Sequence, residues 1–481
     1  MFYGRKEELN NLALLWKKRT SSLVTCRGRR RIGKSSLIEE FARQSDCRFL
    51  EIVGAAPQPK MTNADQLANF MTQLSMQAEL PSSLSAANWL EAFAYLDMAI
   101  RDDGRTVVLL DEVSWMGRYD ANFAGSLKTI WDTKLKRHDR LILVVCGSVS
   151  TWISQNILES SSFAGRLSLN LTLEELPLNL CTQFWGKRRS RLSVRDIVDV
   201  LAVTGGVPKY LEEVDGSVSA DENIRRLCFV PGGPLVDEFE QIFSEVFESS
   251  AEVKKAVLRA LGEGSLSASE IADRLGSERN GHLTRHLQEL ETAGFVAREG
   301  GINPETGKPL KVETYRIRDN YPRFDLHHIE PRLAAIKAGT FRFSSVNELP
   351  GWPTIVGLQF ENLVVCHYHE LLPYLRLGRQ LILSASPYLR RGRKGRGGVQ
   401  VDLLLQMRSA AYFIEVKHQE RVDASVEKEM QEKIARVTFC GEKSKRAVLV
   451  CLGEVDAQIA EDGYFDAIIP FGTILGQGDS V

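Results

Sequence analysis

Residues Gly28–Ser35 read GRRRIGKS, and this stretch decides the fold of the first part of the chain. It matches the pattern G-x-x-x-x-G-K-[ST], a glycine-rich turn that joins a strand to a helix and directs its backbone amides at phosphate groups. The context fits, because the apolar run Ser21–Arg27 precedes the turn and a helix is predicted from about Lys34 to Gln44. The sequence therefore predicts a site for a nucleoside triphosphate, most simply ATP with Mg²⁺.

The residues of this turn have distinct predicted roles. Lys34 is expected to reach the β- and γ-phosphates, and the hydroxyl of Ser35 is expected to bind Mg²⁺. The predicted nucleotide-binding residues of the turn are Gly28, Arg29, Arg30, Arg31, Ile32, Gly33, Lys34, Ser35 and Ser36. The three consecutive arginines have two interpretations, a solvated basic surface beside the phosphates or a contact to a neighbouring subunit or to nucleic acid.

A second motif, Thr106–Glu112 (TVVLLDE), supports the first. It is an apolar strand that ends in two carboxylates, of which Asp111 is expected to hold Mg²⁺ and Glu112 to polarise the attacking water. Leu141–Cys146 (LILVVC) is another fully apolar strand, as a parallel sheet covered on both faces requires. Strands that alternate with helices predict a doubly wound α/β core, here over residues 1–175.

Two further stretches of this region resemble the archaeal-type P-loop ATPases, a branch of the STAND and AAA-like group. The opening FYGRKEEL resembles the (F/Y)xGRxxEL start of that family, which implies that Gly4 and Arg5 lie near the adenine. The strand Leu141–Ser148 ends in GS, like the sensor strand of the family, which implies that Ser148 lies near the γ-phosphate.

Two more short stretches extend the resemblance. Phe163–Leu167 (FAGRL) is similar to the family's GR motif, which implies that Arg166 stabilises charge during hydrolysis, across a subunit interface in a homo-oligomer. The alternative is an ordinary surface arginine. Thr204–Tyr210 (TGGVPKY) is similar to the family's GGxP motif in a helical lid, which implies that Pro208 lies near the nucleotide.

Length and composition bound the rest of the chain. At 481 residues it is expected to hold about three or four domains. The formal net charge is -1, so a nucleic-acid contact would have to be a local patch. None of the eight cysteines forms a CxxC pair, which favours reduced core residues over a zinc site or disulfides. With no signal-like start and no apolar run near a membrane-spanning length, a cytoplasmic protein without membrane contact is expected.

The remaining residues divide by pattern into four predicted segments. Residues 176–249 look helical and suggest a lid, residues 250–320 suggest a winged helix-turn-helix, the proline-containing residues 321–353 suggest a linker, and residues 354–481 suggest a second α/β domain.

The winged helix suggests contact with DNA. Leu283–Ala293 would be its recognition helix, and its polar residues Arg285, His286 and Gln288 could meet a groove. The helix also carries Glu289 and Glu291 and is not strongly basic, so a role as a protein–protein spacer stays open.

The C-terminal region contains a predicted hairpin, Val399–Lys417 (VQVDLLLQMRSAAYFIEVK), in which two apolar runs flank a short turn. Asp402 lies on the first strand, and Glu415 and Lys417 lie on one side of the second, because strand side chains alternate. Two carboxylates repel each other unless a cation intervenes, and Lys417 supplies only one charge. The hairpin therefore predicts a Mg²⁺ or Mn²⁺ site, with Asp402 and Glu415 as ligands, suited to phosphodiester hydrolysis.

This arrangement resembles the PD-(D/E)xK nuclease superfamily, with Asp402 as the motif aspartate and Glu415-x-Lys417 as its E-x-K. The superfamily often adds a glutamate from a preceding helix, and Gly357–Val364 (GLQFENLV) resembles that helix, with Glu361 in this role. No proline precedes the aspartate here. An ordinary ion pair in a hairpin, or a degenerate nuclease fold kept for binding, are the alternatives. A basic loop, Tyr388–Arg396 (YLRRGRKGR), is expected to grip a phosphate backbone or to be a solvated loop.

The sequence as a whole predicts an α/β protein: a P-loop NTPase core with a helical lid, a winged helix-turn-helix and a restriction-endonuclease-like α/β domain. The predicted function is ATP hydrolysis coupled to metal-dependent DNA cleavage by a homo-oligomer, in defence or DNA processing by analogy only. The first alternative is a STAND-type regulatory switch whose C-terminal domain binds DNA or a protein partner without cleavage. The second is a transcription factor that binds DNA through the winged helix.

Overall fold

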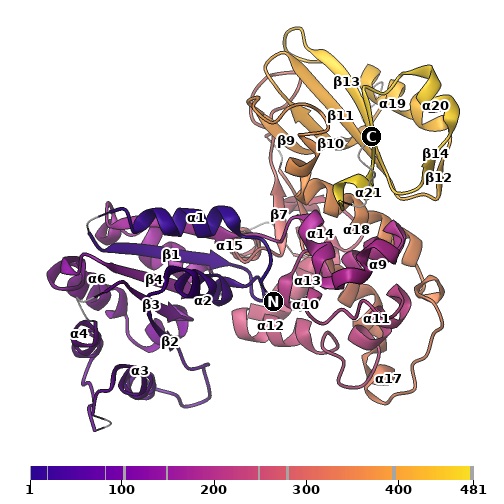
Figure 1. Cartoon of the computed structure of the whole chain (residues 1–481). Helices are drawn as coiled ribbons and strands as arrows, with labels where there is room; N and C mark the ends of the chain where they lie inside the picture. The colour runs from indigo at the N-terminus through magenta and orange to yellow at the C-terminus, as the bar shows by residue number, and fades with distance from the viewer. Residues whose placement is uncertain are drawn as a thin grey trace. The chain divides into compact units, whose positions relative to one another are not determined.

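The computed structural model describes residues 2–18, 20–81, 83–100, 104–147, 150–247, 250–277, 281–311, 313–392 and 397–476. The chain divides into two compact units, Met1–Glu175 and Leu176–Val481. Figure 1 shows the elements of both units.

The first unit is built on a five-stranded parallel sheet in the order β2-β3-β4-β1-β5. Its strands are β1 Ser22–Gly28, β2 Arg48–Val53, β3 Thr106–Asp111, β4 Leu141–Gly147 and β5 Leu167–Leu173. Its main helices are α1 Lys6–Leu15, α2 Lys34–Ser45, α3 Asn63–Ala78, α4 Trp89–Ala99 and α6 Phe123–Thr133, with the short helices α5 Val113–Met116 and α7 Ser150–Ile153.

Helices cover both faces of this sheet, and the alternation of strand side chains explains how (Figure 1). On β3, Val107 and Leu109 pack with α1 and α2, whereas Val108 and Leu110 pack with α3, α4 and α6. Because both faces are buried, every residue of β3 and β4 is buried, which is why these strands read as unbroken apolar runs. The predicted doubly wound α/β core is thus what the structure contains.

The second unit begins with helices. They are α8 Leu178–Cys181, a 3-10 segment Thr182–Arg191, α9 Val194–Thr204, α10 Pro208–Leu211, α11 Ala220–Cys228 and α12 Glu238–Phe247. Gly205, at φ 55, ends α9, and Pro208 starts α10 at its first turn, where proline costs no hydrogen bond. This part of the predicted helical lid therefore consists of two helices separated by a short turn.

A winged helix-turn-helix follows. It consists of α13 Ala251–Leu261, β6 Leu266–Ser267, α14 Ala268–Arg274, α15 Gly281–Thr292, β7 Val296–Glu299 and β8 Thr314–Ile317. The three strands form one sheet in the order β6-β8-β7, and β7 and β8 are the antiparallel arms of the wing. The tip between them includes an isolated bridge between Ile302 and Pro309. The predicted recognition helix corresponds to α15.

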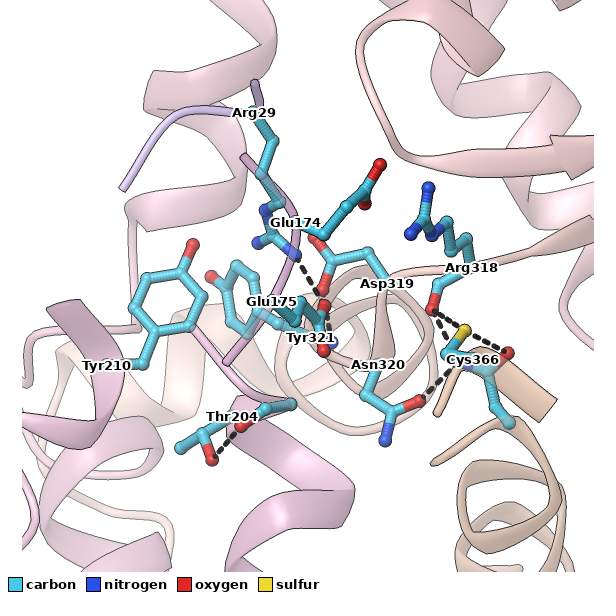
Figure 2. A network of polar contacts seen from close by, with 12 residues as sticks. Arg29, Glu174, Glu175, Thr204, Tyr210, Arg318, Asp319, Asn320, Tyr321 and Cys366 are labelled. Atoms are coloured by element: carbon cyan, nitrogen blue, oxygen red, sulfur yellow. Dashed lines mark hydrogen bonds and ion pairs between the residues drawn. The ribbon is translucent and has the colours of Figure 1, made fainter. Parts of the chain in front are cut away.

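The predicted linker over 321–353 is wrong as a structural assignment. This segment forms α16 Asn320–Phe324, a π-helical turn Asp325–Ile329 and α17 Leu333–Lys337, and it lies in the core of the unit. Tyr321 and Phe324 are fully buried, and the rings of Tyr210 and Tyr321 meet edge to face at 5.3 Å (Figure 2). The prolines mislead because Pro331 and Pro353 occupy first turns of helices rather than a loop.

The C-terminal part contains a mixed five-stranded sheet in the order β15-β13-β11-β10-β9. Its elements are α18 Trp352–Cys366, β9 Ser384–Arg390, β10 Val399–Gln406, β11 Ala410–Lys417, α19 Ser425–Arg436, β13 Ser444–Cys451, α20 Ala457–Asp462, β15 Ala467–Pro470 and α21 Phe471–Ile474; β12 Arg421–Val422 pairs with β14 Glu454–Val455 beside it. Strands β9, β10 and β11 form an antiparallel meander, and β13 and β15 add in parallel. One continuous apolar core runs from Leu176 to Leu475, so the lid, winged helix and C-terminal sheet share it.

Candidate functional sites

The phosphate-binding turn connects β1 to α2 as the sequence predicted. Gly28 ends β1, where a Cβ atom would lie 2.6 Å from the carbonyl oxygen of Leu173, so no larger residue fits. Gly33 adopts φ 85 immediately before α2 and turns the chain into the helix. Lys34 is buried, and its Nζ donates to the carbonyls of Gly28 (3.2 Å) and Arg29 (3.1 Å). The lysine therefore lies inside the turn.

The two predicted Mg²⁺ ligands meet. Ser35 Oγ, at the start of α2, donates a 2.5 Å hydrogen bond to Asp111 Oδ2, at the end of β3. The other oxygen of Asp111 accepts from the backbone amide of Glu112 at 2.8 Å, which fixes the carboxylate. Glu112 itself is held at φ 49 directly before α5. A hydroxyl and a carboxylate oxygen side by side form a donor set that suits Mg²⁺.

The arginines around the turn divide by partner. Arg29 is buried and pairs with Glu175 at 3.2 Å, as Figure 2 shows, so one arginine of the triplet has a structural partner. Arg30 and Arg31 are partly exposed. Arg5, implied by the resemblance to lie near the adenine, donates to the carbonyls of Ile32 (3.3 Å) and Glu174 (2.5 Å) and so braces the turn from behind. Gly4 precedes it at φ 77.

Arg166 and the phosphate-binding turn lie at opposite ends of the parallel strands. Arg166 precedes β5, whose first residue Leu167 pairs with Leu23 near the start of β1, whereas Leu173 pairs with Gly28 at its end. At ~3.3 Å per residue the two ends are roughly 20 Å apart. Arg166 forms a two-pronged ion pair with Asp132 on α6, 2.8 Å for both bonds, and this pairing lowers the pKa of Asp132 to about 2. Within its own chain Arg166 cannot reach the phosphates.

Two other residues that the resemblance places near the nucleotide are Ser148 and Pro208. Strand β4 ends at Gly147, and Ser148, the implied sensor, lies outside the described residues. Pro208 begins α10 and belongs to the second unit, where Gly206 O accepts a bond from the amide of Leu176.

The acidic residues of α15 have partners within the protein. Glu289 pairs with Lys254 of α13 at 2.6 Å, and Lys254 is fully buried. Glu291 pairs with Arg298 of β7 at 3.2 Å. Arg285 is largely exposed, Gln288 is exposed, and burial lowers the pKa of the half-buried His286. The two glutamates that argued against a DNA-binding helix are thus paired with basic residues of the same domain.

The wing packs on the C-terminal sheet rather than projecting freely. Gln406 of β10 donates to the carbonyl of Ile302 at 2.6 Å, the amide of Ile302 donates to Ser384 Oγ of β9 at 3.3 Å, and the amide of Cys440 donates to Pro304 O at 2.7 Å. These contacts join two regions that the sequence analysis treated as separate domains.

Two residues of the basic loop Tyr388–Arg396 also pair with the winged helix. Arg390 pairs with Glu305 of the wing at 3.0 Å, and Arg391 pairs with Glu270 of α14. Residues 393–396 lie outside the described part of the chain. The two described arginines of this loop are therefore bound to acids of the winged helix.

The predicted carboxylates converge at the start of the β10–β11 pair. Glu361 comes from α18, Asp402 from β10, and Glu415 and Lys417 from β11. Leu403 pairs with Ile414, so Asp402 and Glu415 are the next residues along the two antiparallel strands. The pairing of β10 with β9 shifts register between Val401 and Leu404, and such bulges re-aim side chains. Asp402 Oδ2 accepts from the amide of Val416 at 2.9 Å.

Burial, carboxylate repulsion and two lysines set the electrostatics of this cluster. Burial, with the nearby charges of Glu415 and Glu361, raises the pKa of Asp402 to about 8. Burial also raises the pKa of Glu361, against the opposing effect of Arg316 and Arg323. Lys433 of α19 donates to both oxygens of Glu415, at 2.8 and 2.6 Å.

The sequence argument for a divalent ion counted one lysine, whereas two lysines bind Glu415. The ammonium of Lys417 lies 3.1 Å from the carboxylate of Glu415 and also pairs with Glu429 of α19 at 2.9 Å. Among the described residues, no group of three or more His, Cys, Asp or Glu side chains is arranged to hold a metal ion. Sequence reasoning missed Lys433 and Glu429, although both occupy one face of the helix that follows the E-x-K strand.

Comparisons with known protein families match the ATPase region and the helix-turn-helix region of the chain. Residues 2–214 match the model of an ATPase domain found predominantly in Archaea, and residues 250–299 match a helix-turn-helix domain. The chain thus contains an archaeal-type P-loop ATPase domain followed by a helix-turn-helix. No helix in the described ranges is both long and apolar enough to span a membrane.

Among individual proteins, the chain is 25% identical over 433 residues to an uncharacterized protein of Methanocaldococcus jannaschii, covering 89% of this chain and 90% of that protein. It is 46% identical over 41 residues to an uncharacterized ATP-binding protein of the same organism, covering 8% of this chain and 70% of that protein. Similar solved structures include the Walker-type ATPase of Pyrococcus abyssi, with 18% identity, TM-score 0.49 and coverage of 68% of this chain and 96% of that one. Another is the ORC2 protein of Aeropyrum pernix, with 16% identity, TM-score 0.42 and coverage of 69% and 94%.

Proposed function

We propose that this protein is a Mg²⁺-dependent ATP hydrolase whose nucleotide state controls a DNA-directed second unit. The observation that carries the ATP part is the hydrogen bond between Ser35 and Asp111. It supports the proposal because it joins the two oxygen ligands that a Mg²⁺ ion takes in such sites, beside the buried Lys34. Bound Mg²⁺ would neutralise charge on the phosphates, Lys34 would bind their oxygens, and Glu112 would orient the attacking water.

The ATP part is tested by nucleotide binding and hydrolysis with the full chain. Lys34→Ala should abolish hydrolysis and weaken ATP binding, because it removes the positive charge inside the turn. Lys18→Ala, an exposed lysine of the same unit, is the control and should leave both unchanged. Wild-type turnover in Lys34→Ala would refute the assignment.

We further propose that the second unit binds DNA and cleaves it with Glu361, Asp402, Glu415 and Lys417. The helix–strand–strand origin of these residues and their convergence support this proposal. A Mg²⁺ or Mn²⁺ ion, when bound, would supply an activated water. Asp402 and Glu415 would hold it, Glu361 would assist, and Lys417 would stabilise developing charge. The exposed Arg285 and Gln288 of α15 support contact with DNA.

A second candidate is a STAND-type switch whose second unit binds DNA or a protein partner without cleavage. The charge balance of the cluster favours it, since Lys433 and Lys417 both pair with Glu415, and burial together with the neighbouring carboxylates raises the pKa of Asp402. Nothing in that balance requires a metal ion. A transcription factor would share the DNA binding but would show sequence-specific affinity instead of cleavage.

One experiment separates these candidates. The full chain is incubated with plasmid and with single-stranded DNA, with Mg²⁺ or Mn²⁺, with and without ATP. Cleavage that is lost in Asp402→Ala and retained in Asp423→Ala, an exposed aspartate of the same region, would establish the nuclease. DNA binding without cleavage by the wild type would favour the switch. ATP hydrolysis should survive Asp402→Ala, because Asp402 lies in a different unit from Lys34.

A further inference from the structure

The segment between α8 and α9 carries a dense group of exposed cations. Lys187–Arg191 reads KRRSR, and Lys187, Arg188, Arg189 and Arg191 are all exposed. Within the described part of the chain, Lys187, Arg188 and Arg191 take part in no ion pair. Asp215 lies near enough for Arg188 to help lower its pKa, but hydrogen bonds from Ser217 are the larger cause. Like charges held together without counter-charges indicate an anionic partner.

The chain on either side of this basic segment is fixed. Trp185 is buried, and its carbonyl lies 2.7 Å from where a Cβ on Gly216 would be, so the two backbones touch. Gly186, at φ 58 and ψ -140, turns the chain outward. Ser193 then caps α9 by accepting from the amide of Asp196 at 3.0 Å. The cations are therefore presented from an anchored turn rather than from a free tail.

Three other exposed cations of this unit differ because they have acidic partners. Lys209 pairs with Glu213 at 3.0 Å, Arg225 with Glu222 at 2.6 Å and Lys337 with Asp237 at 2.7 Å. The arginines that the sequence assigned to phosphate contact, Arg390 and Arg391, are paired as well. Lys187, Arg188 and Arg191 differ from these paired cations because they lie within five consecutive residues and take part in no described ion pair.

The surroundings of the segment point to nucleic acid as that partner. Arg195, on the first turn of α9, pairs with Glu420 at 2.8 Å, three residues after Lys417 ends β11. Thr182, at the other end, contacts the carbonyl of Leu475 beside α21. The first turn of α9, directly after the basic segment, thus contacts the loop that follows the carboxylate-bearing strand. A phosphate chain held there would pass next to that strand.

We propose that Lys187, Arg188 and Arg191 bind the phosphate backbone of nucleic acid and guide it toward the carboxylate cluster. This inference rests on the proposed action of the second unit on DNA. Each cation would meet a phosphate as a point charge or, for the arginines, through a forked pair of hydrogen bonds. Because such contacts read no base, the segment would contribute affinity independent of sequence.

The test compares two triple variants of the full chain by fluorescence anisotropy with a short labelled single strand and a duplex, across about 50–200 mM salt. The test variant is Lys187→Gln, Arg188→Gln, Arg191→Gln. The matched control is Lys209→Gln, Arg225→Gln, Lys337→Gln, which removes the same charge from paired positions. The melting temperature and ATP hydrolysis of both variants are measured alongside.

The test variant should bind at least about tenfold more weakly than the control, and the slope of log K against log salt should fall by about 2 to 3. Affinity and slope equal to those of the control would overturn the inference while leaving DNA binding by the unit intact. Absence of DNA binding by the wild type would overturn the proposed DNA function and this inference with it. A selective loss of binding to vesicles of anionic lipid, with DNA binding unchanged, would assign the segment to a membrane surface and reject nucleic acid.

Discussion

Glu289, on the outer part of the recognition helix, is bound at 2.6 Å by the fully buried Lys254 of the neighbouring helix. Lys254 also donates to Ser250 Oγ at 2.6 Å, and its ammonium lies 4.6 Å from the ring centre of Phe247. The charge of Glu289 is therefore directed inward. An acid that the sequence counted against DNA contact is part of the packing between α13 and α15.

This pair predicts a large stability difference between two glutamates of one helix. Glu289→Ala should lower the free energy of unfolding by about 3 kcal/mol, because it leaves the ammonium of Lys254 buried without its counter-ion. Glu291→Ala, which breaks the more exposed pair with Arg298, should cost less than about 1 kcal/mol. Chemical denaturation of both variants measures the difference. Equal losses would mean that Ser250 and Phe247 suffice to hold the buried charge.

Glu112→Gln should separate binding of ATP from its hydrolysis. The substitution keeps the shape of the side chain but removes the charge that would orient water, so turnover should fall by about 100-fold or more. The bond between Ser35 and Asp111 is untouched, so ATP affinity should stay near the wild-type value. Equilibrium binding and phosphate release are measured on one preparation. Hydrolysis at the wild-type rate would assign water positioning to another residue.

Arg166 should act only between subunits, because roughly 20 Å of strand separates it from the turn of its own chain. Arg166→Ala and Lys34→Ala should each be inactive alone. Mixed together, they should regain partial activity where an intact Arg166 faces an intact turn. Light scattering with ATP reports the oligomer. If the mixture stays inactive, or Arg166→Ala alone hydrolyses normally, the arginine serves only its ion pair with Asp132.

Acid should destabilise the second unit through His328. This side chain is fully buried between Phe324 and Trp352, neither ring nitrogen has a hydrogen-bond partner among the described residues, and burial lowers its pKa to about 4. Between pH 6.5 and 4 the unfolded chain binds the proton and the folded one does not, so the free energy of unfolding falls as pH falls, by about 3 kcal/mol over this window.

The control for this effect is His328→Phe, measured at each pH beside the wild type. Asp199 and Asp402, whose pKa is raised to about 7 and about 8, act in the opposite direction in both proteins, so the difference between the two isolates His328. The variant should lose less stability on acidification than the wild type. Parallel pH profiles would show that protonation of His328 is not coupled to unfolding.

The local motifs were predictable from sequence because each depends on neighbours along the chain. The turn around Lys34 needs a strand, two glycines and a helix start, and all lie within a short window. Ser35 and Asp111 meet because both lie at the carboxyl ends of parallel strands of one sheet, and each belongs to a motif that the sequence shows by itself. The wing of the winged helix and the hairpin around Met407 were likewise visible as paired apolar runs around turns.

What could not be predicted depends on contacts distant in sequence. Lys433 reaches Glu415 only because α19 packs on the sheet, and no local pattern announces that packing. The burial of Tyr321 reflects a shared core that removes the expected linker. Likewise, the sequence does not show that Arg390, predicted to contact phosphate, pairs with Glu305 of the wing.

The packing of the wing on the C-terminal sheet has a consequence for fragments of the protein. Strand β9 is the edge of the C-terminal sheet, and an uncovered edge is a template on which other chains add strands. The wing contacts that strand, where the amide of Ile302 donates to Ser384 Oγ. A fragment that begins after the winged helix would lose this contact and should self-associate through β9.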